Sequence, residues 1–207
     1  MIGIVDYGVG NLFSLKSSLN SLNVDCSITA DKDKLASCDG IILPGVGAFE
    51  DAVNKLKNNG LDIFVKDFVK GGRKILGICL GMQLLFDKSF EYGEHKGLGL
   101  IPGDVIPLVN RIGKGYKIPH MGWNSLDIRK SDGILSKINN GDYVYYVHSY
   151  YAETDAKYIT ATSEYGKIDV TASVQSGNVY GTQFHPEKSG KVGLEILEQF
   201  VRMCKEQ

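Results

Sequence analysis

The first half of the chain alternates short apolar runs with stretches in which apolar residues recur every three or four positions. Short apolar runs between turn residues predict buried strands, and the three-to-four spacing predicts amphipathic helices, the first with Asn11 as its N-cap. The expected strands are residues 2–6, 24–29, 40–43 and 74–79, and the expected helices are 12–22, 48–56 and 61–69, with a further helix starting at 82–86. Strands that alternate with helices indicate a mostly parallel sheet covered on both faces.

The second half changes to short runs that are rich in Val, Ile, Thr and Tyr and are separated by turn residues. These runs, at residues 105–109, 143–147, 158–163, 170–175 and 179–184, predict antiparallel or mixed strands. A final amphipathic helix is expected at residues 190–205. We therefore expect a single α/β domain over residues 1–207, in which a central, mostly parallel sheet flanked by helices carries an added antiparallel β-layer.

Composition and charge exclude some classes of binding partner. The chain has 207 residues, of which 43% are hydrophobic, and a formal net charge of −1. These values are ordinary for a globular protein and indicate no surface for nucleic acid or anionic membranes. The sequence contains no run of about 18 apolar residues, the length that a membrane-spanning helix needs. The four cysteines form no CxxC pair and have no metal-ligand spacing with histidine, which predicts a reduced, cytosolic protein without a metal or cofactor.

The segment at residues 75–83 is the strongest candidate for chemistry. It reads Ile-Leu-Gly-Ile-Cys-Leu-Gly-Met-Gln, an apolar run that ends in Gly-x-Cys-x-Gly and passes directly into a helical pattern. This pattern is typical of a nucleophile elbow, with Cys79 where hydrolases often carry serine. Glycines suit the turn because Cβ atoms beside the nucleophile would clash, and free amides of the following helix can hold an oxyanion. The alternative is a buried strand cysteine beside two turn glycines.

Two further segments contain the groups that a thiol nucleophile needs. His185 and Glu187 stand two residues apart at the end of a strand-like run, so both can face one side as a base and its orienting acid. The string Leu-Pro-Gly-Val-Gly at residues 43–47 follows another strand, and its glycines allow backbone N–H groups to approach a developing oxyanion. Each segment taken alone also fits an ordinary turn.

Together these segments resemble the class I, triad-type glutamine amidotransferases, in order and separation, over nearly the whole chain. The resemblance implies a flavodoxin-like α/β fold and hydrolysis of L-glutamine. It assigns Cys79 as the nucleophile, His185 as the general base and Glu187 as the acid that orients it. The oxyanion donors that it implies come from Val46, Gly47 and Leu80.

Longer strings make the resemblance more specific. Val-Asp-Tyr-Gly-Val-Gly-Asn-Leu at residues 5–12, Pro-His-Met-Gly-Trp-Asn at 119–124 and Tyr-Val-His-Ser-Tyr at 146–150 are similar to the glutaminase subunits of imidazole glycerol phosphate synthases. This resemblance implies a heterodimer in which ammonia passes internally to a (β/α)8 cyclase subunit. That subunit makes imidazole glycerol phosphate and aminoimidazole carboxamide ribotide in histidine biosynthesis.

The same resemblance implies further residue roles and a form of regulation. The substrate would be bound by Gln83, Glu91, Ser149 and Tyr150. The cyclase-facing surface would contain His120, Trp123, Asn124, Tyr145 and Lys188. Hydrolysis by the isolated chain would be slow, because a peptide flip in the Gly-Val-Gly segment can aim an N–H into or away from the oxyanion position.

Three alternatives stay open at this point. Gly8 and Gly10 follow a strand and open a helix, with Asp31 after the second strand, as in a dinucleotide-binding motif, but Phe13 replaces the third glycine. A catalytically silent scaffold or regulatory subunit would keep the same residues without turnover. A glutaminase that serves another synthase, such as a surface-sugar amidotransferase, would share the triad but not the acceptor.

Overall fold

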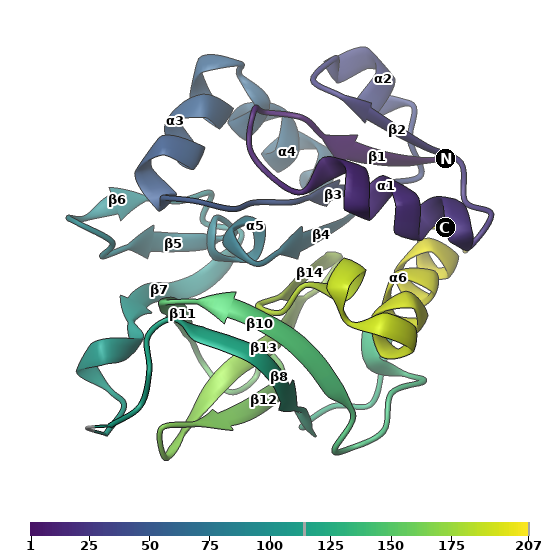
Figure 1. Ribbon diagram of the computed structural model, residues 1–207. Coiled ribbons are helices and arrows are strands. Elements are labelled where there is room, and N and C mark those ends of the chain that lie inside the picture. Colours follow the sequence, from purple (N-terminus) through teal and green to yellow (C-terminus); the bar gives the residue numbers. More distant parts are fainter. Residues whose placement is uncertain (114, 207) are drawn as a thin grey trace.

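The computed structural model describes residues 1–113 and 115–206, and within them the strands form one large sheet of eight strands beside sheets of two and of four. The large sheet consists of β1 (Ile2–Val5), β2 (Cys26–Thr29), β3 (Gly40–Leu43), β4 (Lys74–Ile78), β9 (Asp127–Ile128), β12 (Ile159–Tyr165), β13 (Ile168–Ser176) and β14 (Val179–Thr182). Its order is β2-β1-β3-β4-β14-β13-β12-β9, parallel from β2 to β14 and antiparallel beyond (Figure 1). The parallel half has the flavodoxin-like order, so the expected fold class is confirmed.

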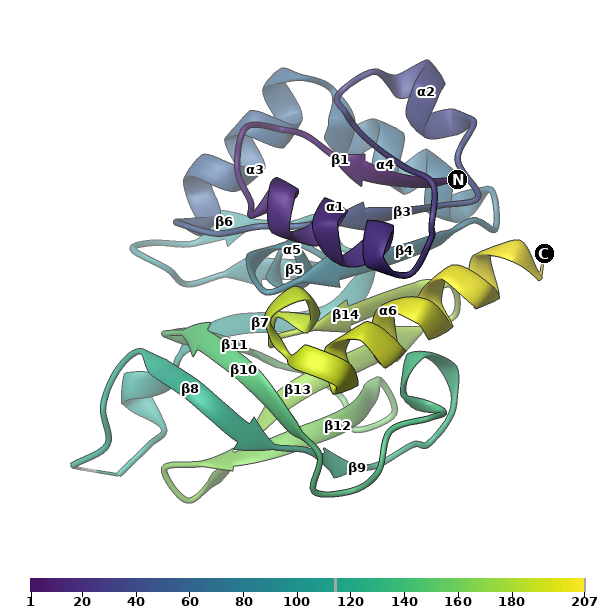
Figure 2. The same ribbon diagram turned by 45° about the vertical axis from the view of Figure 1, so that its right-hand side comes forward.

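Helices cover both faces of the parallel half, as the sequence predicted. On one face, α1 (Leu12–Ser21) and α6 (Gly190–Lys205) lie side by side (Figure 2). The other face is covered by α2 (Lys32–Ala36), α3 (Phe49–Asn58) and α4 (Leu61–Lys70). Because both faces are covered, β1 and β3 are buried at every position, which explains their apolar sequences without alternation. Every helix in the described part of the chain is too short or too polar to cross a bilayer.

Two smaller sheets lie beside the large one, one of them antiparallel and the other with both parallel and antiparallel pairs. One sheet pairs β8 (His120–Ser125) with β10 (Tyr143–His148). The other contains β5 (Phe86–Ser89), β6 (His95–Lys96), β7 (Ile101–Pro107) and β11 (Tyr150–Glu153), in the order β11-β7-β5-β6. Three short 3-10 helices are described, η1 (Leu108–Asn110), η2 (Gly133–Leu135) and η3 (Pro186–Lys188). The sequence did not predict β5, β6, β8, β9 or β11, because these strands are short or lack a regular apolar alternation.

The prediction of a helix that starts at residues 82–86 is wrong, because only a single helical turn forms before the next strand begins. The helix α5 (Leu80–Gln83) has a single turn, and Phe86 already begins β5. The chain leaves the helix because a later segment occupies its backbone acceptors: the Leu98 N–H donates to Leu84 O at 2.8 Å, and the Leu100 N–H donates to Leu85 O at 2.8 Å. In so short a buried apolar run, periodicity cannot distinguish a helix from a strand.

The other predicted elements are present, with shifts at some ends. The strand β3 and the helix α6 have the expected bounds, whereas β2 begins at Cys26 rather than at residue 24. Asn11 occupies the N-cap position of α1 as expected, but its side chain makes no capping hydrogen bond. The predicted stabilisation by this side chain is therefore absent.

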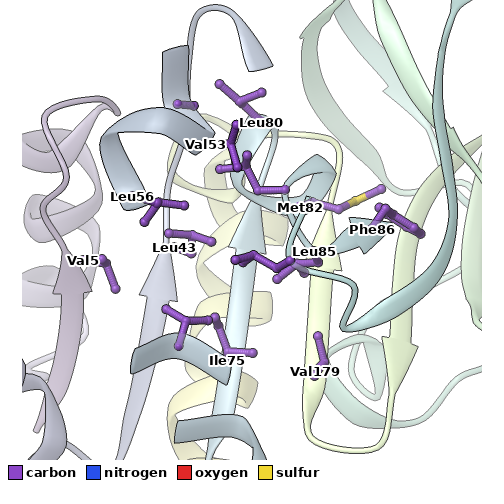
Figure 3. Close-up of a cluster of buried hydrophobic side chains, with 14 of the residues drawn as sticks. Val5, Leu43, Val53, Leu56, Ile75, Leu80, Met82, Leu85, Phe86 and Val179 are labelled. Carbon is purple, nitrogen blue, oxygen red and sulfur yellow. The ribbon is translucent and has the colours of Figure 1, made fainter. Parts of the chain in front are cut away.

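The turn between β4 and α5 is closely packed on both sides. Leu80 and Met82 belong to a buried cluster that also contains Leu43 of β3 (Figure 3). A Cβ on Gly81 would overlap the carbonyl oxygen of Leu43, and a Cβ on Gly77 would lie 2.7 Å from the carbonyl oxygen of Gly81. Close backbone approach therefore requires both glycines of Gly-x-Cys-x-Gly.

The substitution Gly81→Ala is expected to destabilise the fold by about 3 kcal/mol, because the added methyl group meets a main-chain oxygen that cannot move without distorting β3. The matched control is Gly71→Ala, whose Cβ would lie 3.4 Å from its nearest neighbours, in ordinary contact. Urea denaturation midpoints of the wild type and both variants measure the difference. Equal midpoints for the two variants would contradict the close packing at Gly81.

Candidate active site

Cys79 lies between β4 and α5 in a backbone conformation that few residues adopt. Its φ of 54° and ψ of −111° lie outside the regions that L-residues favour, which costs roughly 1–3 kcal/mol. The Cys79 N–H donates to Thr182 O at 2.7 Å, and the residue is only 6% exposed. This strained strand–turn–helix geometry is that of the predicted nucleophile elbow.

The parallel pairing of β14 with β4 brings His185 to Cys79 from the other end of the chain. The last residues of the two strands are register partners, so the segments that follow them meet at one edge of the sheet. The backbone of His185 is fixed there, because its N–H donates to Tyr145 O at 2.9 Å and its carbonyl accepts from Ser189 Oγ at 2.6 Å. The imidazole therefore occupies a defined position beside the thiol.

The imidazole of His185 is bonded to the carboxylate of Glu187. The distance from Nδ1 to Oε1 is 2.8 Å, and both side chains are almost fully buried. Burial lowers the His185 pKa, but the neighbouring Cys79 and the hydrogen-bonded carboxylate of Glu187 outweigh it and raise the pKa to about 9. The Nε2 atom has no well-aligned hydrogen bond among the described residues. Its contact with the thiol is therefore loose, as is common before substrate binds.

A cavity of about 430 Å³ opens beside Cys79, large enough for a small ligand. The predicted site residues that line it are Val46, Gly47, Cys79, Leu80, Gln83, Glu91, Ser149, Tyr150 and His185. Pro119, Val147 and His148 complete its wall. Glu187 lies on the far side of the imidazole, where it contacts Nδ1.

The residues expected to form an oxyanion hole lie on two sides of the thiol. Leu80 is the first residue of α5, so its N–H has no acceptor within the helix. Gly47 has a φ of +95°, a left-handed conformation that favours glycine, and the neighbouring Val46 is exposed. The loop is anchored by Tyr7, whose buried hydroxyl donates to Pro44 O at 2.6 Å. Burial raises the pKa of Tyr7 well above its ordinary value, so the hydroxyl keeps its proton.

Gln83 and Glu91 present polar side chains at fixed positions on the cavity wall. The Gln83 Nε2 donates to Tyr150 O at 2.9 Å and to Gln183 Oε1 at 3.0 Å. The Glu91 carboxylate accepts the N–H of Phe49, the first residue of α3, at 2.6 Å. This contact places a carboxylate at the N-terminus of a helix, where the helix dipole favours it.

Three of the residues expected to face the partner form a cluster at the surface, here called the aromatic surface: exposed Trp123 and Lys188 and half-buried Tyr145. The Trp123 ring is edge-on to the Tyr145 ring, with centroids 6.1 Å apart, and Trp123 is 55% exposed. Lys188 Nζ lies 5.8 Å from the centroid of the Tyr145 ring. Because Lys188 and Glu187 belong to the same 3-10 turn, the aromatic surface adjoins the His185–Glu187 pair.

His120 was expected on the same surface, but its ring points inward. The residue is 3% exposed, and its ring stacks against those of Tyr146 and Tyr165 at centroid distances of 4.6 and 4.0 Å. Side chains alternate in direction along β8. Met121 and Trp123 are exposed, so His120, which precedes Met121, faces the interior. The expectation of a surface position for His120 is therefore corrected.

Asn124, His120 and His148 form a row of hydrogen bonds that ends at the cavity. Asn124 Nδ2 lies 3.3 Å from His120 Nε2, and His120 Nδ1 lies 3.0 Å from His148 Nε2. His148 Nδ1 donates to Tyr150 O at 2.9 Å. Burial lowers the pKa of His120 to about 4 and that of His148 to about 3, so both rings are neutral near pH 7. Since the carbonyl can only accept, each ring donates through Nδ1 and accepts through Nε2.

The sequence patterns assign no role to His148 or Gln183, although both residues reach the site. Gln183 is fully buried, and its Nε2 lies 3.8 Å from Cys79 Sγ. The available signal was its place two residues before His185 in a strand-like run, because alternate strand residues share a face. For His148, the signal was its position directly before Ser149.

Asp31, which a dinucleotide-binding motif would use to contact a ribose, caps a helix instead. Its Oδ1 accepts the N–H of Asp33 at 3.0 Å and the N–H of Lys34 at 3.2 Å, at the start of α2. Within residues 1–113 and 115–206, no group of three or more His, Cys, Asp or Glu side chains is arranged to hold a metal ion.

Comparison with known proteins agrees with this geometry. The sequence model described as glutamine amidotransferase class-I matches residues 3–204. The imidazole glycerol phosphate synthase subunit HisH of Listeria monocytogenes serotype 4b (strain F2365) is 48% identical, over 99% of this chain and 98% of that protein. The HisH subunit of Caldanaerobacter subterraneus subsp. tengcongensis is 50% identical, over 99% of both.

A solved structure shares the fold at lower sequence identity. A chain in the structure of PurLQS from Thermotoga maritima is 20% identical, with a TM-score of 0.74 over 98% of this chain and 97% of that chain. The sequence matches extend over nearly the full length of the protein and include the elbow, the cavity wall and the His185–Glu187 pair. The chain therefore belongs to the class I glutamine amidotransferases and is a member of the HisH family of imidazole glycerol phosphate synthase subunits.

Proposed function

We propose that this chain hydrolyses L-glutamine to glutamate and ammonia with a triad of Cys79, His185 and Glu187. The observation that carries the proposal is the convergence of a thiol, an imidazole and a carboxylate beside one cavity, from strands at distant positions in the chain. Membership of the class I glutamine amidotransferases supports the assignment of the substrate. A catalytically silent scaffold would not require these three groups to lie together.

In this proposal, the reaction proceeds through a glutamyl thioester. The Cys79 thiolate attacks the side-chain amide carbon of glutamine, and the imidazolium of His185 protonates the departing nitrogen as the C–N bond breaks. Neutral His185 then takes a proton from water, which attacks the thioester and releases glutamate and the thiolate. Glu187 fixes the tautomer of His185 and stabilises the imidazolium, in keeping with the raised His185 pKa.

The remaining cavity residues hold the substrate and its developing charge. The N–H groups of Leu80 and of the Val46–Gly47 peptide stabilise the oxyanion of the tetrahedral intermediate. The amino-acid end of glutamine binds near Gln83 and Glu91, with the carboxylate of Glu91 facing the α-ammonium group. The backbone at Ser149 and Tyr150 completes this subsite.

The ammonia passes, in this proposal, to a cyclase subunit with a (β/α)8 barrel that forms a heterodimer with this chain. There it reacts with a phosphoribulosyl-formimino carboxamide ribotide to give imidazole glycerol phosphate and aminoimidazole carboxamide ribotide, a step of histidine biosynthesis. The names of the HisH relatives support this acceptor. The aromatic surface is the proposed docking face, because aromatic side chains are enriched at interfaces. Asn124, which was also expected there, is half-buried and contacts the buried His120.

We further propose that residues 1–207 act as one domain in the cytosol. The site draws on both halves of the chain, since Cys79 precedes the antiparallel strands and His185 follows them. All four cysteines, Cys26, Cys38, Cys79 and Cys204, are free, as a reducing compartment favours.

In the complex with the cyclase subunit, Cys79→Ala is expected to lower glutamine-dependent ribotide turnover by about 10⁴-fold or more, because no thioester can form. Turnover with added ammonia should persist, since the acceptor site lies on the partner. Cys26→Ala, a half-buried cysteine away from the cavity, is the control. Glutamine hydrolysis without ribotide turnover in the wild-type complex would instead indicate a different synthase, such as one for surface sugars.

Replacing Glu187 with Gln is expected to lower the His185 pKa from its value of about 9, because the hydrogen bond and charge of Glu187 help to raise it. The imidazolium then loses its proton at lower pH, and glutaminase activity falls by about a hundredfold or more. Proton NMR of the histidine Cε1–H resonances against pH measures the first effect. Glu198→Gln, on the exposed face of α6, should change neither quantity, and an unchanged His185 titration in Glu187→Gln would exclude the orienting role.

The isolated chain is expected to hydrolyse glutamine slowly and to speed up when the cyclase subunit and its ribotide ligand bind. The physical reason is the Gly-Val-Gly segment, where a peptide flip next to the left-handed Gly47 can reorient an oxyanion donor at low cost. Glutamate release is measured for the chain alone, with the cyclase, and with the cyclase plus ligand. Equal rates in all three conditions would refute regulation through this loop.

A further inference from the structure

Two buried glutamines connect the substrate side of the cavity to the nucleophile. Gln83 Nε2 donates to Tyr150 O at 2.9 Å and to Gln183 Oε1 at 3.0 Å. Gln183 Nε2 in turn lies 3.8 Å from Cys79 Sγ. The Gln183 N–H donates to Ala172 O at 2.8 Å, so the second glutamine is held on the sheet itself. The amides thus form a continuous row that ends at the sulfur.

The Tyr150 carbonyl determines the orientation of both amides. A carbonyl oxygen cannot donate, so the Gln83 atom that contacts it must be the nitrogen. The Gln183 atom that accepts from this nitrogen must be an oxygen, which leaves the Gln183 nitrogen facing Cys79. Tyr150 O also accepts from His148 Nδ1 at 2.9 Å, so both of its lone pairs are engaged. A flipped Gln83 would place two oxygens against each other.

This orientation decides what Gln83 offers to a ligand. Both of its N–H groups are used within the protein, so its Oε1 is the polar atom that remains for the substrate. An acceptor suits the ammonium or amide N–H groups of glutamine and does not suit its carboxylate. Gln183, which does not line the cavity, therefore occupies the second N–H of Gln83 and holds this side chain in the orientation that Tyr150 O sets.

The same orientation affects the sulfur. A thiol at Cys79 can donate to Val147 O at 3.9 Å, an interaction that a thiolate cannot make. The Gln183 N–H is a donor, and donors bond more strongly to a charged acceptor than to a neutral one. Gln183 therefore favours the form of Cys79 that attacks a carbon electrophile.

We propose that Gln183 is a positioning residue of this site, which supports the reactive sulfur of Cys79 and, together with Tyr150 O, holds Gln83 as a hydrogen-bond acceptor for the substrate. The part that concerns the substrate rests on the proposed glutaminase function. The part that concerns the sulfur does not, because it depends only on contacts within the chain.

The first test measures S-alkylation of Cys79 by iodoacetamide, which forms a thioether and releases iodide, at a fixed neutral pH and without glutamine. Gln183→Met removes the amide at nearly constant volume and is expected to slow alkylation about tenfold, the effect of one hydrogen bond to a charged group. Gln199→Met is the matched control, because Gln199 is an equally buried glutamine on α6 outside the cavity. Peptide mass analysis identifies the alkylated cysteine, and thermal unfolding of both variants shows whether they fold.

The second test is a double-mutant cycle on glutamine hydrolysis in the complex with the cyclase subunit. Gln183→Met is expected to raise KM about fivefold to tenfold, because Gln83 loses one of the two hydrogen bonds that hold its side chain. In a Gln83→Met background, the same change should leave KM where it is and still slow alkylation. A merely structural role would raise KM equally with and without Gln83.

Two outcomes overturn the proposal. One is alkylation of Gln183→Met at the rate of the wild type or of Gln199→Met. The other is a KM increase that is equally large with and without Gln83. If the wild-type complex fails to hydrolyse glutamine at all, the proposed function fails, and the alkylation rates still decide the role of Gln183 at the sulfur.

Discussion

The site depends on one backbone interaction, the parallel pairing of β4 with β14. This pairing inserts the last strand of the chain next to the strand that precedes the nucleophile. The hydrogen bond from the Cys79 N–H to Thr182 O closes it at the edge where chemistry occurs. A slip of one residue would turn the side chains of β14 to the opposite face and carry Gln183 and His185 away from the sulfur.

The strain at Cys79 is sustained by the packing beneath it. The unfavourable φ and ψ angles cost roughly 1–3 kcal/mol, and the buried neighbours Leu80 and Met82 leave the turn no room to relax. The glycines at positions 77 and 81 permit this contact because backbone meets backbone there. The nucleophile is thus attached to a closely packed turn, whereas the loop that contains Gly47 is exposed and open on one side. The closely packed and the exposed parts of the site therefore lie on separate elements.

Much of this arrangement could be predicted from the sequence, and the limits have physical causes. Continuous apolar runs predicted the parallel strands, and the Gly-x-Cys-x-Gly pattern predicted the elbow, because both depend on local sequence. The end of α5 could not be predicted, since it is set by hydrogen bonds from residues 98 and 100. The inward ring of His120 and the contact of Gln183 with the sulfur likewise depend on which strands are neighbours, which local sequence patterns do not specify.

Tyr145 joins the exterior of the molecule to the interior through different parts of one residue. Its ring belongs to the aromatic surface, while its carbonyl oxygen accepts the N–H of His185. Every amino acid supplies that oxygen, so the anchor of the imidazole is indifferent to the identity of the side chain. Evolution can therefore remodel the outer face at this position to suit another protein without disturbing the geometry of proton transfer behind it.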